Sequence, residues 1–140
     1  MEIIEDYLKK PYWIIDILPK QVPEHSPGQY GAVERYFRKK AALRRKQLNI
    51  LLKLNCYYDL VLQRAGGQTT NPEPKLLKSV VGEEYLNVLV GGALIVVDHT
   101  DTYMTVYGAD HEFLELLSQL AASEGLFVWQ PEINDDADRS

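Results

Sequence analysis

Residues 85–130 read YLNVLVGGALIVVDHTDTYMTVYGADHEFLELLSQLAASEGLFVWQ and decide the fold, because they hold the longest apolar runs and the clearest turn signals. Apolar residues flank Gly91-Gly92, which predicts a β-hairpin, since two consecutive residues that adopt positive φ suit a type I′ turn. Residues 93–97 are apolar on both alternating faces and are expected to form a central strand. A second turn at 98–101 leads into a strand expected over 102–107.

The same stretch continues as a helix and a strand. Asp110 is the expected N-cap of a helix that buries Phe113 and Leu117, and Gly125 suits the position just after its C-terminus. Residues 126–130 are expected to form the last strand. A strand, helix and strand of this size favour a right-handed crossover, so this strand should run parallel to strand 102–107 if both share a sheet.

Upstream, the sequence YWIIDIL at 12–18 predicts a first strand between two prolines. Ser26 as N-cap and Pro27 at the first helical position predict the start of a helix. Its apolar stripe is interrupted by Arg44, which predicts a kink or two helices broken between 40 and 44. The stripe itself consists of Val33, Phe37, Ala41, Leu48, Leu51, Leu52 and Asn55.

Shorter elements fill the remaining chain. Residues 56–63 predict a strand, the turn-rich stretch from Gly66 predicts a loop, and Pro74 is expected to open a short helix that ends before Gly82. These elements together predict an α+β fold, with a largely antiparallel sheet of about five strands in the order β-α-β-β-β-β-α-β and helices packed on it. A single domain is expected over 1–131, followed by an acidic, disordered tail at 132–140.

Composition excludes several classes of protein. A hydrophobic fraction of 46% and a charged fraction of 25% are those of a globular protein. Cys56 lies in an apolar run and is expected to be a buried, inert thiol in a reducing compartment. The N-terminus lacks the basic start and long apolar segment of a signal peptide, and the run at 88–97 is about half the ~20 residues of a membrane helix. A cytoplasmic protein with no membrane association is expected.

The charge is unevenly distributed. The net charge is −5, yet one segment holds eight of the fifteen basic residues: Arg35, Arg38, Lys39, Lys40, Arg44, Arg45, Lys46 and Lys53. A solvated helix face explains this segment, while binding of nucleic acid or an acidic partner through residues 35–46 is the alternative. No recognised nucleic-acid motif accompanies it.

Two acidic and histidine-containing clusters are candidates for catalysis or metal binding. Asp98, His99 and Asp101 occupy a predicted turn, and residues 110–112 begin a predicted helix, so each cluster has a structural explanation. The intervening strand separates the clusters by roughly 20 Å. A metal-dependent enzyme built on Asp98, His99 and Asp101 is therefore the weakest alternative, and no sequence motif for a cofactor or a nucleophile is present.

Aromatic residues favour a binding function. Tyr103, Tyr107 and Trp129 lie on predicted strands, where amphipathic aromatics suit a protein interface, although helices could equally cover that face. Asp16 and Asp59 each interrupt an apolar run, and such carboxylates more often face solvent or bond nearby backbone than become buried with a raised pKa. The sequence predicts a non-enzymatic module of immunity, antitoxin or adaptor type, which binds a protein partner or a second copy of itself.

Overall fold

The computed structural model describes residues 3–25 and 27–132 of the chain. Ser26, the expected helix cap, and all of the expected acidic tail except Glu132 lie outside these ranges. The helices are α1 (Ile3–Tyr7), α2 (Tyr30–Arg38), α3 (Ala41–Leu54), α4 (Pro74–Val80) and α5 (His111–Ser123). The strands are β1 (Tyr12–Asp16), β2 (Leu60–Arg64), β3 (Gly67–Thr70), β4 (Leu86–Val90), β5 (Ala93–Val97), β6 (Met104–Tyr107) and β7 (Phe127–Trp129).

The strands form one sheet in the order β3-β2-β4-β5-β6-β1-β7, with every neighbouring pair antiparallel. The predicted α+β class is confirmed, although the sheet has seven strands instead of about five. One missed strand is β3, whose sequence GQTT follows a glycine pair and lacks the apolar alternation that marks a strand. It pairs only with β2, at the edge of the sheet.

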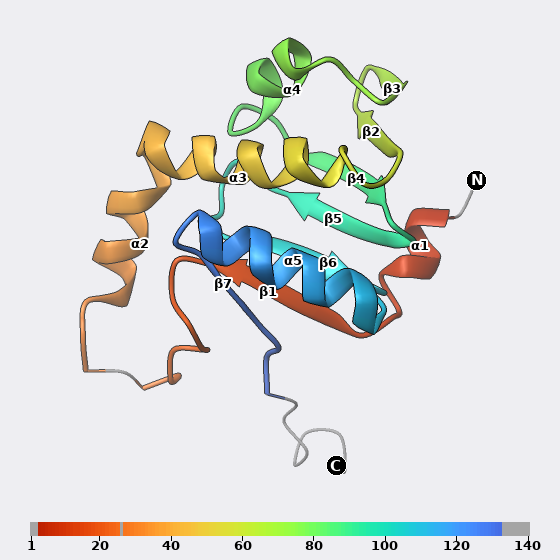
Figure 1. Ribbon diagram of the computed structural model, residues 1–140. Helices are drawn as coiled ribbons and strands as arrows, with labels where there is room; N and C mark the ends of the chain where they lie inside the picture. Colours follow the sequence, from red (N-terminus) through yellow and green to blue (C-terminus); the bar gives the residue numbers. More distant parts are fainter. Residues whose placement is uncertain (1–2, 26, 133–140) are drawn as a thin grey trace.

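Helices and sheet form two layers (Figure 1). α3, α4 and α5 pack on one face of the sheet, where Leu51, Leu77 and Phe113 are almost fully buried. The alternate residues of each strand point to this face, as in Leu86, Val88 and Val90 of β4. The other face of the sheet carries the remaining strand residues, and part of it forms the cleft described below.

The central hairpin and α5 match the sequence expectations. Gly91 and Gly92 have φ of 60° and 76° between β4 and β5, and β5 is the central strand of the sheet. Asp110 caps α5, since its Oδ1 accepts a hydrogen bond from the backbone N–H of Phe113 at 2.8 Å. Gly125, with φ of 78°, follows the C-cap.

β7 runs parallel to β6, as expected, but the two strands are not neighbours. β1 lies between them and pairs antiparallel with both, with Ile14 opposite Thr105 on one side and Trp129 on the other. The N-terminal strand is therefore inserted between two strands that lie close together in the sequence.

The long basic segment forms two helices, as one of the sequence alternatives proposed, with the break at Lys39-Lys40. The expected apolar stripe is wrong for α2. Val33 and Phe37 are 40% and 37% exposed, and α2 buries no residue. The reason is its position, because α2 projects from one end of α3 instead of lying on the sheet (Figure 1).

The expected strand at 56–63 begins only at Leu60, because residues 56–58 continue from α3 in a turn. Cys56 is exposed instead of buried, and its Sγ lies 3.6 Å from the carbonyl oxygen of Leu52. Asp59 is exposed as well and accepts a hydrogen bond from the side chain of Asn71. None of the helices described combines the length and apolar character that crossing a bilayer requires.

Candidate functional site: an acidic aromatic cleft

A cleft of about 700 Å³ opens on the sheet face opposite α3, α4 and α5. Its floor comes from alternate residues of β1, β6 and β7. Tyr12 stands opposite Tyr107, and Ile14 stands between Thr105 and Trp129. Strand pairing thus brings together side chains from both ends of the sequence, and four of these five floor residues are polar or aromatic.

The walls come from irregular segments and α2. The lining residues outside the strands are Leu8, Gln21, Val22, Pro23, Glu24, Tyr30, Glu34, Tyr103 and Pro131. The loop after β1 and the segment after β7 are held together, because Gln21 Oε1 accepts a hydrogen bond from the backbone N–H of Glu132 at 2.9 Å. A volume of this size is typical of a ligand-binding cleft.

Asp16 is the buried carboxylate of the cleft. Its side chain ends β1, is 7% exposed, and accepts a hydrogen bond from the backbone N–H of Ile17 at 2.7 Å. Burial raises the pKa of Asp16, and the nearby carboxylate of Glu34 raises it further. The backbone N–H groups of Ile17 and Leu18 and the Trp129 indole lower this pKa, but burial outweighs them. Trp129 Nε1 is buried and makes no hydrogen bond of standard geometry with the described residues, although it lies close enough to influence the carboxylate.

Negative charge concentrates at one end of the cleft. Burial raises the pKa of the Tyr30 hydroxyl, and the carboxylates of Glu34, Asp16 and Asp101 raise it further. Burial and the same three carboxylates also raise the pKa of the Tyr103 hydroxyl. Burial also raises the pKa of Asp101, and the nearby carboxylates of Asp98 and Glu34 raise it further. Two nearby arginines lower this pKa, but their effect is smaller.

The opposite end of the cleft differs. Burial raises the pKa of Tyr107 as well, but there the neighbouring groups are the hydroxyls of Tyr12 and Tyr85, with no carboxylate among the influences. The cleft is therefore polarised, with an acidic end beside α2 and an uncharged aromatic end beside Leu8.

Two residues of the basic segment hold the wall of the cleft in place. Arg38 Nη1 donates to the carbonyl oxygen of Thr100 at 3.0 Å, and Arg44 Nη2 donates to that of His99 at 2.9 Å. Arg44 also bonds the side chain of Gln47, and burial lowers the pKa of its guanidinium. These contacts connect the junction of α2 and α3 to the turn before β6, so α2 keeps its position although it buries no residue.

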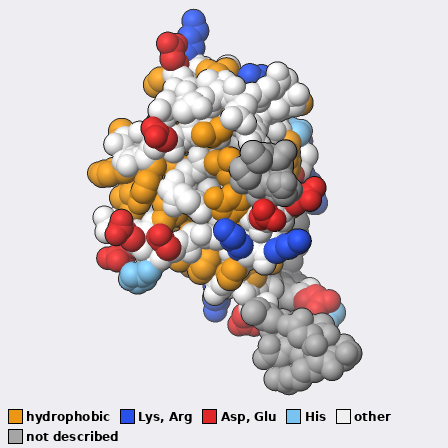
Figure 2. Space-filling model, turned by 90° about the vertical axis from the view of Figure 1, so that its right-hand side faces the viewer, with side chains coloured by type: hydrophobic (Ala, Val, Ile, Leu, Met, Phe, Trp, Pro, Cys, Tyr) orange, Lys and Arg blue, Asp and Glu red, His pale blue; other side chains and the backbone are white. Residues whose placement is uncertain are grey.

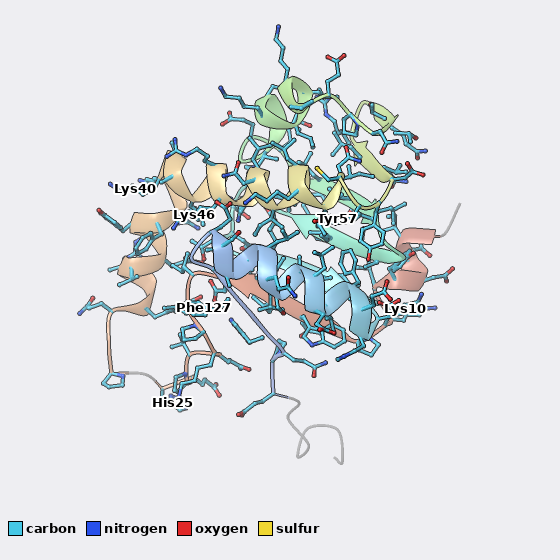
Figure 3. All side chains as sticks on the ribbon, in the orientation of Figure 1. Lys10, His25, Lys40, Lys46, Tyr57 and Phe127 are labelled. Atoms are coloured by element: carbon cyan, nitrogen blue, oxygen red, sulfur yellow. The ribbon has the colours of Figure 1, made fainter. Side chains whose placement is uncertain are left out.

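The structure distributes the sequence-predicted binding residues over two regions. Tyr103, Tyr107 and Trp129 all line the cleft. The basic side chains of Arg35, Lys39, Arg45 and their neighbour Lys40 are exposed on α2, α3 and the turn between them, and Figure 3 labels Lys40 at that turn. Side chains of both charges and apolar groups are interspersed on the α1 end of the molecule in Figure 2.

Most of the residues that line the cleft were not predicted from the sequence. Tyr12, Asp16, Tyr30 and Glu34 were not among the predicted binding residues, and Asp16, which attracted attention as a strand carboxylate, proves to be buried while also bonding backbone. One signal was present, because a strand that alternates Tyr12, Ile14 and Asp16 on one face presents a mixed surface to whatever faces it.

The turn at Asp98, His99 and Asp101 has a structural role. Burial alone would raise the pKa of Asp98, but hydrogen bonds from Thr100 outweigh burial and lower this pKa. Asp98 Oδ1 accepts from the backbone N–H of Thr100 at 2.9 Å and from its Oγ1 at 2.7 Å. Across residues 3–25 and 27–132, no three His, Cys, Asp or Glu side chains converge as a metal ion requires.

The cleft thus combines a buried carboxylate, aromatic walls and a polarised charge distribution. No protein-family model, curated protein or solved structure matches this chain.

Proposed function

We propose that this protein is a binding module that recognises a protein partner through the cleft formed by β1, β6 and β7. One observation carries the proposal: a cleft of about 700 Å³ gathers four tyrosines and a tryptophan on one side of the molecule. Tyr and Trp supply large contact areas at low cost in conformational entropy and are enriched in protein interfaces.

The shape of the cleft supports a peptide or loop as its occupant. The floor follows β1 from Tyr12 to Asp16, a length of ~13 Å at the rise of a β-strand. Four residues of an extended segment fit this length. The apolar residues Leu8, Ile14 and Val22 offer contacts for uncharged side chains of such a segment.

The alternative partner, nucleic acid bound through residues 35–46, has weaker support. Arg38 and Arg44 donate hydrogen bonds to backbone carbonyl groups of the turn at 98–101. Fewer basic side chains of the segment therefore remain to contact phosphate groups. The carboxylates of the cleft would repel phosphate groups. For the metal-dependent alternative at Asp98, His99 and Asp101, no three potential metal ligands converge among the described residues.

Site-specific cross-linking tests the proposal. A photoreactive amino acid is placed at Tyr12, 41% exposed on the cleft, and in a second protein at Tyr57, 67% exposed beside α3 on the helix side (Figure 3). After irradiation in extract of the cells that make the protein, a defined partner should be attached through position 12 and not through position 57. A cross-link between two copies of the chain would identify self-association as the form of binding.

A blocking variant completes the test. Thr105→Trp places a large side chain on the floor of the cleft and should abolish the cross-link from position 12, with a circular-dichroism melt to show that the protein still folds. Equal labelling from both positions, or no protein adduct from position 12, would rule out the cleft as the interface.

A further inference from the structure

The chemistry of the cleft specifies the side chain that it accepts. Its lining includes three acidic residues, Asp16, Glu24 and Glu34, and none of the described residues that line it is Lys, Arg or His. Asp16 and Glu24 form no ion pair among the described residues, and the partner of Glu34, Arg38, lies at 3.9 Å. The lining of the cleft is therefore acidic, and Arg38 offsets part of the charge of Glu34.

The acidic end of the cleft is also its aromatic wall. Tyr30 and Tyr103 line the cleft near Asp16 and Glu34, close enough for both carboxylates to act on both hydroxyls. A cation near such rings is attracted by their faces as well as by the carboxylates. The carboxylates repel anions and bind uncharged hydrogen-bond donors less strongly than cations, so the end beside α2 favours a positively charged group.

Among biological cations, the guanidinium group of arginine fits best. It is planar, binds carboxylates through two parallel hydrogen bonds, stacks on aromatic rings, and is more weakly hydrated than the ammonium group of lysine. Burial at Asp16, whose side chain is only 7% exposed, penalises a strongly hydrated cation more than a weakly hydrated one.

Resting on the function proposed above, we propose that the cleft binds an arginine side chain of the partner. The guanidinium group lies at the end lined by Asp16, Tyr30 and Glu34, and neighbouring residues of the partner follow the floor toward Tyr12 and Leu8. The partner segment therefore carries one arginine followed or preceded by uncharged residues, and the cleft selects arginine over lysine.

A random-peptide display experiment on the folded chain tests this specificity. Selected peptides are titrated into ¹⁵N-labelled protein, and those that shift the indole N–H resonance of Trp129 are assigned to the cleft. These peptides should share one arginine. Replacing it with citrulline, which has the same shape and no charge, should weaken binding at least tenfold, and lysine should weaken it several-fold.

Matched protein variants identify the carboxylate. Glu34→Gln should weaken the arginine peptide by about tenfold and leave its citrulline form unchanged. Glu115→Gln is the matched control, because it removes the same charge from α5. Like Glu34, Glu115 pairs with a residue four positions away, here His111 at 3.4 Å. This control should leave the binding of both peptides unchanged.

The outcomes separate the two proposals. Cleft-binding peptides that share no basic residue, or that bind equally well as citrulline forms, overturn the arginine specificity and leave the protein-binding function standing. If no peptide shifts the Trp129 resonance at any concentration, both proposals fail together.

Discussion

Replacing Arg44 with methionine should loosen the α2 wall of the cleft. Arg44 donates to the carbonyl oxygen of His99 at 2.9 Å and, at a longer 3.4 Å, to that of Arg38. Methionine cannot donate these bonds, but it retains an apolar stem next to Gly82, where an added Cβ atom would lie 2.7 Å from Cγ of Arg44. The variant therefore removes the hydrogen bonds and keeps most of the packing.

The expected cost follows from those contacts. A hydrogen bond from a charged donor stabilises a folded protein by roughly 1.5–3 kcal/mol. Arg44 is partly exposed, and its bonds to His99 and to the Gln47 side chain are short, at 2.9 and 3.0 Å. We therefore expect Arg44→Met to lower the free energy of unfolding by about 1–2 kcal/mol. In a chain of this size that change lowers Tm by roughly 3–8 °C.

Two assays with a matched control check this prediction. Arg45→Met changes the same charge on the next residue of α3, where the side chain is exposed, and should change stability by less than about 0.5 kcal/mol. Hydrogen exchange should show amides of α2 exchanging about tenfold faster in Arg44→Met than in Arg45→Met, since tenfold corresponds to about 1.4 kcal/mol. Equal melting temperatures and equal exchange in the two variants would refute the view that Arg44 holds α2.

Three further substitutions test other parts of the fold. Asn71 has φ of 49°, and its Oδ1 accepts the backbone N–H of the first residue of β2 at 2.9 Å, so in urea denaturation Asn71→Ala should cost about 1–3 kcal/mol and more than Asn71→Gly, which tolerates that φ. Gly91→Ala would place a Cβ atom 2.4 Å from Phe113 Cδ1, whereas Gly92→Ala meets nothing within 4 Å. Both substitutions strain a positive φ, but the first should be less stable than the second by a further 1–3 kcal/mol or so, and equal stabilities would contradict the packing described. Because burial raises the pKa of Asp16 above 3.8 in the folded state, its protonated form favours folding; the stability of the wild type relative to Asp16→Asn should be highest at acidic pH and fall as pH rises through the folded-state pKa. Urea titrations of both proteins from pH 3 to 7 would show the opposite slope if Asp16 were stabilised as a carboxylate.

The hairpin at 86–97 and the ends of α5 could be predicted because their signals are local. A glycine pair between apolar runs specifies its own turn, and Asp110 bonds an amide three residues away. Such features depend on neighbours in the sequence, and the rest of the molecule hardly alters them.

α2 shows where local patterns mislead. Val33 and Phe37 have the spacing of a buried helix face, yet both are exposed, because periodicity shows that a helix has an apolar side and not what lies against it. The prediction that Cys56 is buried was wrong for a related reason. The apolar residues before it belong to the end of helix α3 and not to a strand, and Cys56 is exposed.

The cleft could be predicted only in part. Tyr103, Tyr107 and Trp129 were expected to contribute to binding, but their meeting with Tyr12 and Asp16 depends on the insertion of β1 between β6 and β7. No spacing in the sequence reveals that order of strands, because it depends on pairing between distant segments.

The position of β1 also affects how the molecule is made. During synthesis β1 emerges before both of its partner strands. Its first partner, β6, is not available until residues 104–107 have been made, and its second, β7, not until residues 127–129 have been made. The hairpin of β4 and β5 with α3 can form earlier, since contacts between nearby segments need less loop closure. Pulse-labelling hydrogen exchange during refolding should therefore show amides of β1 protected after those of β4 and β5. If so, a nascent chain that has not yet reached β7 lacks the floor of the cleft, and the partner binding proposed above requires the strands that are made last.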